Sequence, residues 1–93
     1  MTIGVLQLDL FIPQANSFKT KRQVLKGLMD RIRHKFNVSV AQAGGVDKWQ
    51  RQALAIACIS NDKRLINRIL SKIADLAACY SAIELLDYTI EFY

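Results

Sequence analysis

The sequence predicts an α+β fold in which two helices cover one face of a four-stranded antiparallel sheet. Four stretches alternate apolar and polar residues, which is the period of a strand, and two longer stretches repeat apolar residues every three or four positions, which is the period of a helix. These stretches follow one another in the order β-α-β-β-α-β. The chain has 93 residues, so we expect one domain over residues 1–93, because two domains would each be too small to bury a core.

Strands are predicted at residues 2–12, 37–43, 49–59 and 82–92. Pro13 has no amide hydrogen to donate and ends the first strand, whereas Gly44 and Gly45 turn the chain after the second. Asp47 is expected to fix that turn. Since alternate residues point to opposite faces, each strand has one face for the core. The expected core residues are Leu6, Leu8, Leu10, Ile12, Val38, Val40, Leu54, Ile56, Cys58, Leu86, Tyr88, Ile90 and Phe92.

Two helices are predicted, over residues 17–36 and over about residues 62–80. Ser17 is expected to cap the first by accepting a hydrogen bond from its first turn, and the cluster at 60–62 (Ser-Asn-Asp) precedes the second. Each helix has one apolar stripe that can face the sheet. The stripe residues are Phe18, Leu25, Leu28, Met29, Ile32 and Phe36 in the first helix, and Leu65, Ile66, Ile69, Leu70, Ile73, Leu76, Ala77 and Tyr80 in the second.

This order of elements is the split βαβ, or ferredoxin-like, arrangement. Each βαβ half crosses over with the right hand, which places both helices on the same face of the sheet. The expected strand order is 4-1-3-2, with the two long strands, the first and the third, in the centre. The other face is left to water or to a partner, and is predicted to carry Gln7, Asp9, Trp49, Arg51, Ala53, Ala55, Ala57, Asp87, Thr89 and Glu91.

The first predicted helix carries the positive charge of the chain. Residues 17–36 hold seven Lys and Arg and one Asp, a net charge of +6 against +5 for the whole chain, so the remainder carries −1. Four of these cations lie within roughly 60° of one another on one side of the apolar stripe. This group, which we call the basic flank, consists of Lys19, Arg22, Lys26 and Arg33; the opposite flank holds Lys21, Arg31 and Lys35.

Cations fixed on one rigid surface are what a sequence-neutral phosphate contact requires. The alternative is a solvated surface whose long basic side chains cover the edge of the core. Trp49, beside Arg51, is similarly open to two interpretations: it stacks on a base or anchors a partner, or it covers the end of the hairpin. The small side chains of Ala53, Ala55 and Ala57 either let a second copy approach the sheet closely or are covered by their own long neighbours.

The sequence contains no arrangement of residues typical of an enzyme, a metal site or a cofactor site. His34 is the only histidine and is expected on the outward side of its helix. Cys58 and Cys79 lack the spacing of zinc ligands and are expected to be reduced core thiols. The N-terminus lacks a positive leader region, and no apolar run approaches the ~20 residues that span a bilayer. We therefore expect a cytoplasmic protein without a membrane partner.

Several segments of the chain resemble the YlxP-like family, domain-of-unknown-function family 503, over essentially the whole length. They are residues 4–13 (GVLQLDLFIP), 17–41, 47–51 (DKWQR) and 60–62 (SND). Members start the first helix with His-Ser-Leu-Lys-x-Lys-Arg; here Asn16 replaces the His and Phe18 the Leu, so no role of that His is carried over. The matching residues are Ser17, Lys19, Lys21 and Arg22. The resemblance implies a ferredoxin-like fold and no known activity. Members are often encoded near translation and ribosome-maturation genes, which favours an RNA contact only by association.

These observations favour a binding protein that is not an enzyme and that contacts RNA or a ribosomal subunit through its first helix. The expected contact residues are Lys19, Lys21, Arg22, Lys26 and Arg33, with Trp49 and Arg51 as accessory contacts if the hairpin lies on the same side. The alternative is a homodimer or larger homo-oligomer, joined through the alanine-rich face of the sheet or through an edge strand.

Overall fold

The predicted βαββαβ order is confirmed in the computed structural model, which describes residues 1–45 and 48–93. The prediction that Asp47 fixes the turn lies outside the described residues. The elements are β1 (Thr2–Phe11), α1 (Phe18–Lys35), β2 (Ser39–Gly44), β3 (Arg51–Ser60), α2 (Lys63–Ala78) and β4 (Glu84–Phe92).

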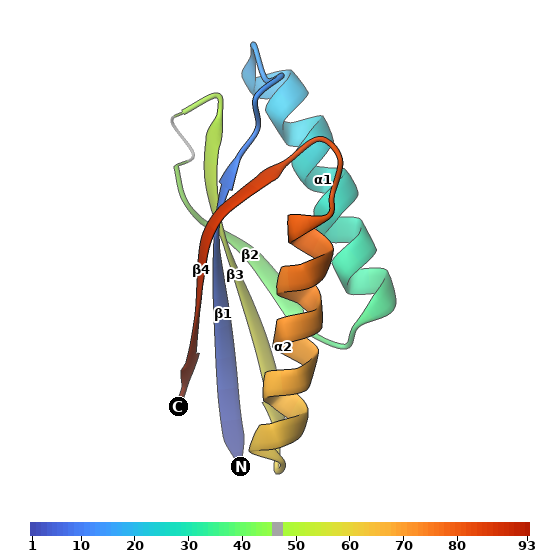
Figure 1. Cartoon of the computed structure of the whole chain (residues 1–93), viewed down its shortest axis with the longest axis vertical. Helices are drawn as coiled ribbons and strands as arrows, with labels where there is room; N and C mark the ends of the chain where they lie inside the picture. The colour runs from blue at the N-terminus through green and yellow to red at the C-terminus, as the bar shows by residue number, and fades with distance from the viewer. Residues whose placement is uncertain (46–47) are drawn as a thin grey trace.

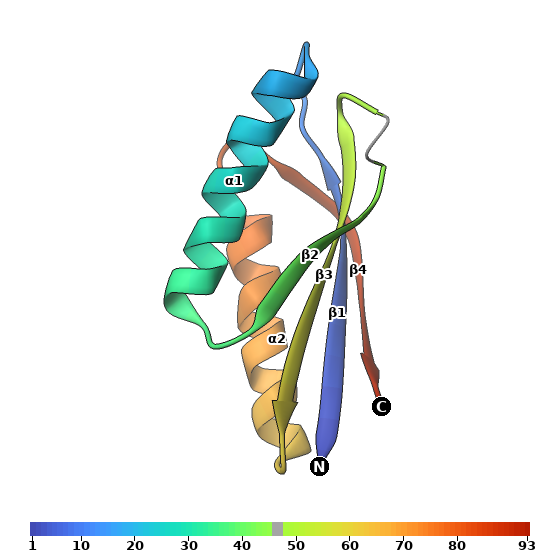
Figure 2. The same cartoon turned by 180° about the vertical axis from the view of Figure 1, so that it is seen from behind.

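The four strands form one antiparallel sheet in the order β2-β3-β1-β4, which is the predicted order read from the other edge. The central strands β1 and β3 pair along their whole length, from Thr2 opposite Ser60 to Phe11 opposite Arg51. Both helices lie on one side of the sheet (Figures 1 and 2). The molecule is long and narrow, 42 × 21 × 18 Å, and at one end the end of β1, the start of α1 and the β2–β3 hairpin come together (Figure 1).

Both helices begin where the sequence predicts. The hydroxyl oxygen of Ser17 accepts a hydrogen bond from the Thr20 amide at 3.2 Å, and a carboxylate oxygen of Asp62 accepts one from the Arg64 amide at 3.0 Å. Side-chain acceptors at these positions satisfy amide groups that have no partner within the helix. Neither helix within the described ranges is long and apolar enough to span a membrane.

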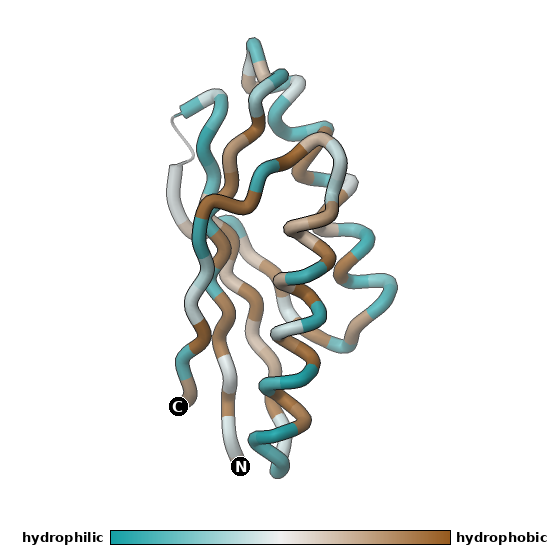
Figure 3. Tube along the Cα trace, viewed as in Figure 1, coloured by the Kyte–Doolittle hydropathy of each residue, from teal (hydrophilic) through white to brown (hydrophobic). Residues whose placement is uncertain are grey.

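The core lies between the sheet and the helices. Hydrophobic and hydrophilic residues alternate along the strands, which gives the sheet its apolar inner face (Figure 3). The predicted core faces of β1 and β3 are confirmed, with Leu6, Leu8, Leu54 and Ile56 fully buried. The α2 helix packs directly on β1 at Gly4, where an added Cβ would overlap Ile66 and come within 3.0 Å of Leu70.

Five predicted core positions are wrong: Leu86, Tyr88, Leu65, Cys79 and, at the start of α1, Phe18. Tyr88 is 48% exposed because it lies on the edge strand β4. Leu86 is 47% exposed because a register shift between Asp9 and Leu10 places Leu85, rather than Leu86, opposite Leu10. Leu65 is 37% exposed because it lies about 100° around α2 from its buried neighbour Ile66. Cys79 follows the end of α2 and is exposed because its position points away from the buried stripe of that helix.

Candidate nucleic-acid interface

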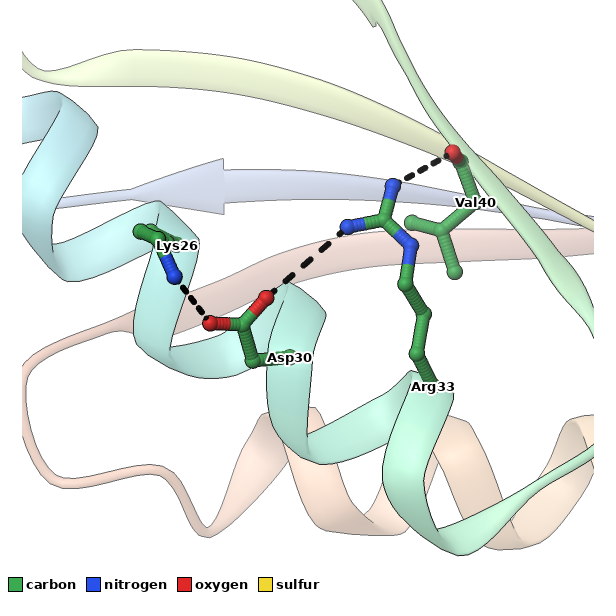
Figure 4. A network of polar contacts seen from close by, with 4 residues as sticks. All are labelled: Lys26, Asp30, Arg33 and Val40. Carbon is green, nitrogen blue, oxygen red and sulfur yellow. Dashed lines mark hydrogen bonds and ion pairs between the residues drawn. The ribbon is translucent and has the colours of Figure 1, made fainter.

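The four cations of the basic flank are all exposed, but only two of them are without a protein partner in the part of the chain that the structure describes. Lys26 donates a hydrogen bond to the Asp30 carboxylate at 2.5 Å. Arg33 donates one to the carbonyl oxygen of Val40 at 3.0 Å and lies 4.0 Å from Asp30 (Figure 4). Lys19 and Arg22, nearer the start of α1, have no such partner among residues 1–45 and 48–93.

Asp30 is therefore the counter-charge of the basic flank. The hydrogen bond from Lys26, together with the positive charges of Lys26 and Arg33, lowers the pKa of the Asp30 carboxyl below its ordinary value. The contact from Arg33 to Val40 also ties α1 to the edge strand β2. Two of the four predicted cations are thus partly occupied, so the unpaired positive charge of the basic flank is concentrated toward the N-terminal end of α1.

Lys21 is not a surface residue, so its predicted surface role is wrong. Its side chain is 3% exposed, and its ammonium group donates to the carbonyl oxygens of Gly45 at 2.7 Å and Lys48 at 2.6 Å. The spacing from Lys21 to Leu25, four residues, places it on the buried stripe of α1. Near the start of the helix, however, that stripe faces the backbone of the β2–β3 hairpin, which supplies hydrogen-bond acceptors for the charge.

A second buried polar side chain holds the same hairpin. Gln52, on the inner face of β3, is 1% exposed and donates to the carbonyl oxygen of Gly44 at 2.7 Å. Lys21 and Gln52 are the two buried polar residues of the described ranges, and both donate to hairpin carbonyl groups. Gly45 allows the turn itself, since its φ of +75° is unfavourable for residues with a Cβ.

Trp49 lies against α1 at this end of the molecule and not on the open face of the sheet, where it was predicted. It precedes β3, and its ring meets that of Phe18 edge to face, with centroids 6.2 Å apart and planes at 89°. Phe18, predicted in the core, is 39% exposed, and Trp49 is 52% exposed. We call these two residues the aromatic tip. Phe18 borders both the buried stripe and the basic flank of α1, so the aromatic tip adjoins Lys19 and Arg22.

Arg51 lines a small hollow together with Trp49, but its guanidinium pairs on the open face of the sheet. Its guanidinium donates to both carboxylate oxygens of Asp9, at 2.8 and 3.0 Å. Both residues line a shallow hollow of about 390 Å³ on the open face, together with Gln7, Ala53, Asp87 and Thr89. The guanidinium of Arg51 is therefore occupied by Asp9, and its accessory contact with RNA stays a prediction.

Arg31 and Lys35, on the opposite flank, line the groove between α1 and the C-terminal part of α2. Arg31 borders two adjoining hollows there, of about 380 and 330 Å³, and Lys72 of α2 borders the second. Cys79 and Tyr80 line both hollows. This groove adds positive charge to the α1 side of the molecule, as predicted for Arg31 and Lys35.

No group of three or more His, Cys, Asp or Glu residues that could hold a metal ion occurs in residues 1–45 or 48–93. His34 is exposed on α1 as predicted. Both cysteines are free thiols, but only Cys58 is buried. Burial raises the pKa of the Cys58 thiol, which disfavours the thiolate needed for metal binding or nucleophilic attack.

Sequence reasoning missed the assembly of this end of the molecule, although one signal was available. The spacing that groups Leu25, Leu28 and Ile32 on one stripe also includes Lys21, four residues before Leu25. A lysine on an apolar stripe must either reach water or find acceptors within the fold. Which acceptors it finds depends on the hairpin, 24 and 27 residues further along the chain, and no local pattern reveals that contact.

Comparisons with known proteins agree with the fold and show the family. The designed protein Foldit4 superposes with a TM-score of 0.57 at 12% identity, covering 100% of this chain and 97% of that one. A designed protein with a ferredoxin fold, LFR1 1, gives a TM-score of 0.51 at 13% identity, covering 100% of this chain and 83% of that one. At such identities the likeness concerns the fold alone.

A natural relative extends the likeness to the sequence. The uncharacterized protein YlxP of Bacillus subtilis (strain 168) is 34% identical over 82 residues, which are 88% of this chain and 89% of that protein. The sequence profile described as protein of unknown function (DUF503) matches residues 3–90. The chain therefore belongs to the DUF503 family of proteins of unknown function.

Proposed function

We propose that this protein binds RNA, with the backbone of the RNA lying along the basic flank of α1. The observation that carries the proposal is the concentration of exposed, unpaired cations at the start of that flank. Lys19 and Arg22 lack protein partners within the described chain, and Arg31 and Lys35 add positive charge on the other side of the helix. A fixed array of cations neutralises phosphates and releases their counterions, which favours binding of any nucleic-acid backbone.

Structured RNA, including ribosomal RNA, is the partner class that we propose. Phosphate contacts position a protein but do not read sequence, so selectivity would come from the shape of the RNA or from exposed bases. The basic flank lies on a helix that is capped at Ser17 and tied to β2 through Arg33, so its cations are held at constant spacing. Lys21 and Arg51 are not part of this proposal, because Lys21 is buried and Arg51 pairs with Asp9.

We propose a binding role and not a catalytic one. The single histidine, His34, stands exposed on α1. Of the two thiols, Cys58 is buried and its raised pKa keeps it protonated at neutral pH. A general base or nucleophile requires a neighbouring group that activates it, and these side chains do not form such a pair.

The test is binding of the purified protein to a labelled ribosomal RNA fragment, with duplex DNA of equal length as the control, across a series of salt concentrations. We expect log affinity to fall steeply with log salt, and the slope to flatten by about 0.7–0.9 for each phosphate contact removed by Lys19→Gln and Arg22→Gln. The matched control is the double variant Arg64→Gln and Arg68→Gln, two exposed residues of α2 with the same loss of charge. Equal slopes for the two double variants would contradict the proposal.

A homodimer joined through the open face of the sheet is the second candidate. One observation favours it: part of that face is apolar, with Ile3, Val5, Ala57 and Ile59 paired across β1 and β3, and Ile59 is 59% exposed. Exposed apolar patches of this kind often mark interaction surfaces. Light scattering from micromolar to millimolar concentration tests it. A dimer that Ile59→Lys dissociates would support this candidate, and a monomer throughout would exclude it.

A further inference from the structure

The most distinctive unexplained feature of the surface is the aromatic tip. Phe18 and Trp49 come from distant parts of the chain, yet they contact each other edge to face and remain 39% and 52% exposed. Burying a Trp side chain is among the most favourable contributions to a core, so a half-exposed Trp forgoes that stabilisation. The edge-to-face contact leaves ring surface facing outward, where a flat partner can stack.

The structure fixes the backbone on both sides of Trp49. On one side, the carbonyl oxygen of Lys48 accepts a hydrogen bond from buried Lys21 at 2.6 Å. On the other, the carbonyl oxygen of Gln50 accepts one from the Ile12 amide at 2.8 Å, and the Gln50 side chain donates to the carbonyl oxygen of Pro13 at 3.0 Å. These bonds hold the backbone around Trp49, and the contact with Phe18 holds its ring, so less conformational freedom is lost when a partner binds.

The charges around the aromatic tip select the partner. Lys19 and Arg22 of α1 adjoin Phe18, and the exposed side chain of Lys48 precedes Trp49. Aromatic rings beside several cations form the usual surface for single-stranded nucleic acid, in which bases stack on the rings and phosphates pair with the cations. A partner that was only apolar would gain nothing from the neighbouring cations.

We infer that the aromatic tip stacks on an unpaired base of single-stranded RNA, whose neighbouring phosphates continue onto Lys19 and Arg22. This inference deepens the proposed function and rests on it, since it names the part of the RNA that the protein selects. In a duplex the faces of the bases are covered by their neighbours, so only an unpaired base in a loop, bulge or end can lie on Trp49. The tip would thus supply the selectivity that phosphate contacts lack.

Trp49 is the only tryptophan in the chain, so its fluorescence reports directly on the tip. The experiment compares a ten-nucleotide single-stranded RNA with a blunt duplex of the same sequence, using labelled RNA for affinity and Trp49 emission for stacking. We expect the single strand, but not the duplex, to quench Trp49. We expect Trp49→Ala to weaken single-strand binding about 5- to 100-fold and duplex binding less than 2-fold, and Trp49→Phe to retain most of the affinity.

The control is Tyr93→Ala, which removes an exposed aromatic side chain at the opposite end of the molecule (Figure 1) and should change neither affinity. Far-UV circular dichroism checks that each variant is folded. Quenching of Trp49 is measured on the unmodified protein, so it tests the inference even if a variant fails to fold. The inference is wrong if three results occur together: single-stranded RNA does not quench Trp49, Trp49→Ala binds it as tightly as the unmodified protein, and Arg22→Gln still weakens binding. Weak binding that is indifferent to Arg22→Gln as well would overturn the proposed function instead.

Discussion

Lys21 is a charged residue that stabilises the fold from a buried position. Burying an ammonium group is unfavourable unless acceptors replace the lost water, and here the carbonyl oxygens of Gly45 and Lys48 do so at 2.7 and 2.6 Å. The same two bonds join the start of α1 to the β2–β3 hairpin. Two segments that carry the family resemblance, residues 17–22 and 48–51, therefore meet through the backbone contacts of this one side chain.

Lys21→Met tests this structural role. The substitution keeps the length and apolar stem of the side chain but leaves two carbonyl groups without the buried donor, so we expect the free energy of unfolding to fall by about 2–4 kcal/mol. Urea unfolding followed by circular dichroism measures it. Lys19→Met, an exposed position on the same helix, should stay within about 0.5 kcal/mol of the unmodified protein. Equal stability of the two variants would show that the bonds of Lys21 contribute nothing.

The two thiols should differ in reactivity. Cys58 is 6% exposed and burial raises the pKa of its thiol, so little thiolate is available there at neutral pH, whereas Cys79 is exposed after the end of α2. We expect one thiol per chain to react rapidly with a disulfide reagent at pH 8 and the second to react only on unfolding in urea. Cys79→Ser should abolish the rapid phase and Cys58→Ser should leave it intact. Rapid reaction of both thiols would contradict the packing of β3.

At this scale the sequence predicts which positions alternate or repeat, but not which contacts form between distant segments. Leu54, Ile56 and Cys58 were predicted in the core from period-two alternation and are buried. Phe18 matched the apolar spacing of α1, yet it contacts Trp49 and remains 39% exposed. The difference has a physical cause, because the first turn of α1 extends past the end of the sheet and meets the hairpin there.

Among the elements, α1 combines a buried stripe with a basic flank whose charge is partly masked by Asp30. Because the pKa of Asp30 is lower in the folded protein than in the unfolded chain, its ion pairs stabilise the folded protein at any pH above the pKa of the unfolded chain. This stabilisation is lost as the pH falls through the pKa of Asp30 in the folded protein. At neutral pH the carboxylate is charged, so it competes with phosphates for Lys26 and Arg33. Asp30 of α1 therefore weakens the RNA contact that we propose for the same helix.

Asp30→Asn should strengthen RNA binding. The change frees Lys26, raises the net charge from +5 to +6 and adds one phosphate contact, so we expect affinity to rise about 3- to 10-fold near 0.1 M salt and the salt slope to steepen by 0.7–0.9. Filter binding across the same salt series measures both. Asp87→Asn, an exposed residue of the open face of the sheet with the same change in charge, is the control. A decrease in affinity, or an equal rise in both variants, would argue against phosphate contacts at Lys26.

Element types and order were predictable because each strand and helix has its own period, and the strand order followed from right-handed crossovers. The register of β4 could not be predicted in this way. Continuous alternation would bury Leu86, but the shift between Asp9 and Leu10 turns Leu85 inward instead. A local irregularity of this kind depends on how β4 leaves the loop after α2, and the apolar residues Leu85 and Leu86 fit either face equally well.

The whole molecule separates its charges between two faces. The α1 side carries the basic flank, and the open face of the sheet carries Asp9, Asp87 and Glu91 with Arg51 and Lys48 as neighbouring cations. The two shorter dimensions of the molecule, 21 and 18 Å, exceed the Debye length of about 10 Å at 0.1 M salt. Charges on one face are therefore largely screened from a ligand bound at the other.

This separation leads to a comparison in which net charge is held constant. Arg22→Glu and Arg51→Glu each reduce the net charge from +5 to +3, one on the α1 side and the other on the open face. If RNA binds along the basic flank, Arg22→Glu should weaken binding at least 10-fold at 0.1 M salt, because it removes a phosphate contact and adds a repulsion. Arg51→Glu should weaken it less than 3-fold, although it breaks the ion pair with Asp9.

The Arg51→Glu protein should remain folded, because the Asp9 pair is about half exposed and such pairs contribute about 1 kcal/mol or less. Thermal unfolding of both variants checks this before any affinity is compared. Equal losses of RNA affinity would mean that the protein attracts RNA by its total charge alone, with no bound orientation. A larger loss for Arg51→Glu would move the interface to the open face of the sheet, whose hollow beside Asp9 and Thr89 would then be the surface that the RNA contacts.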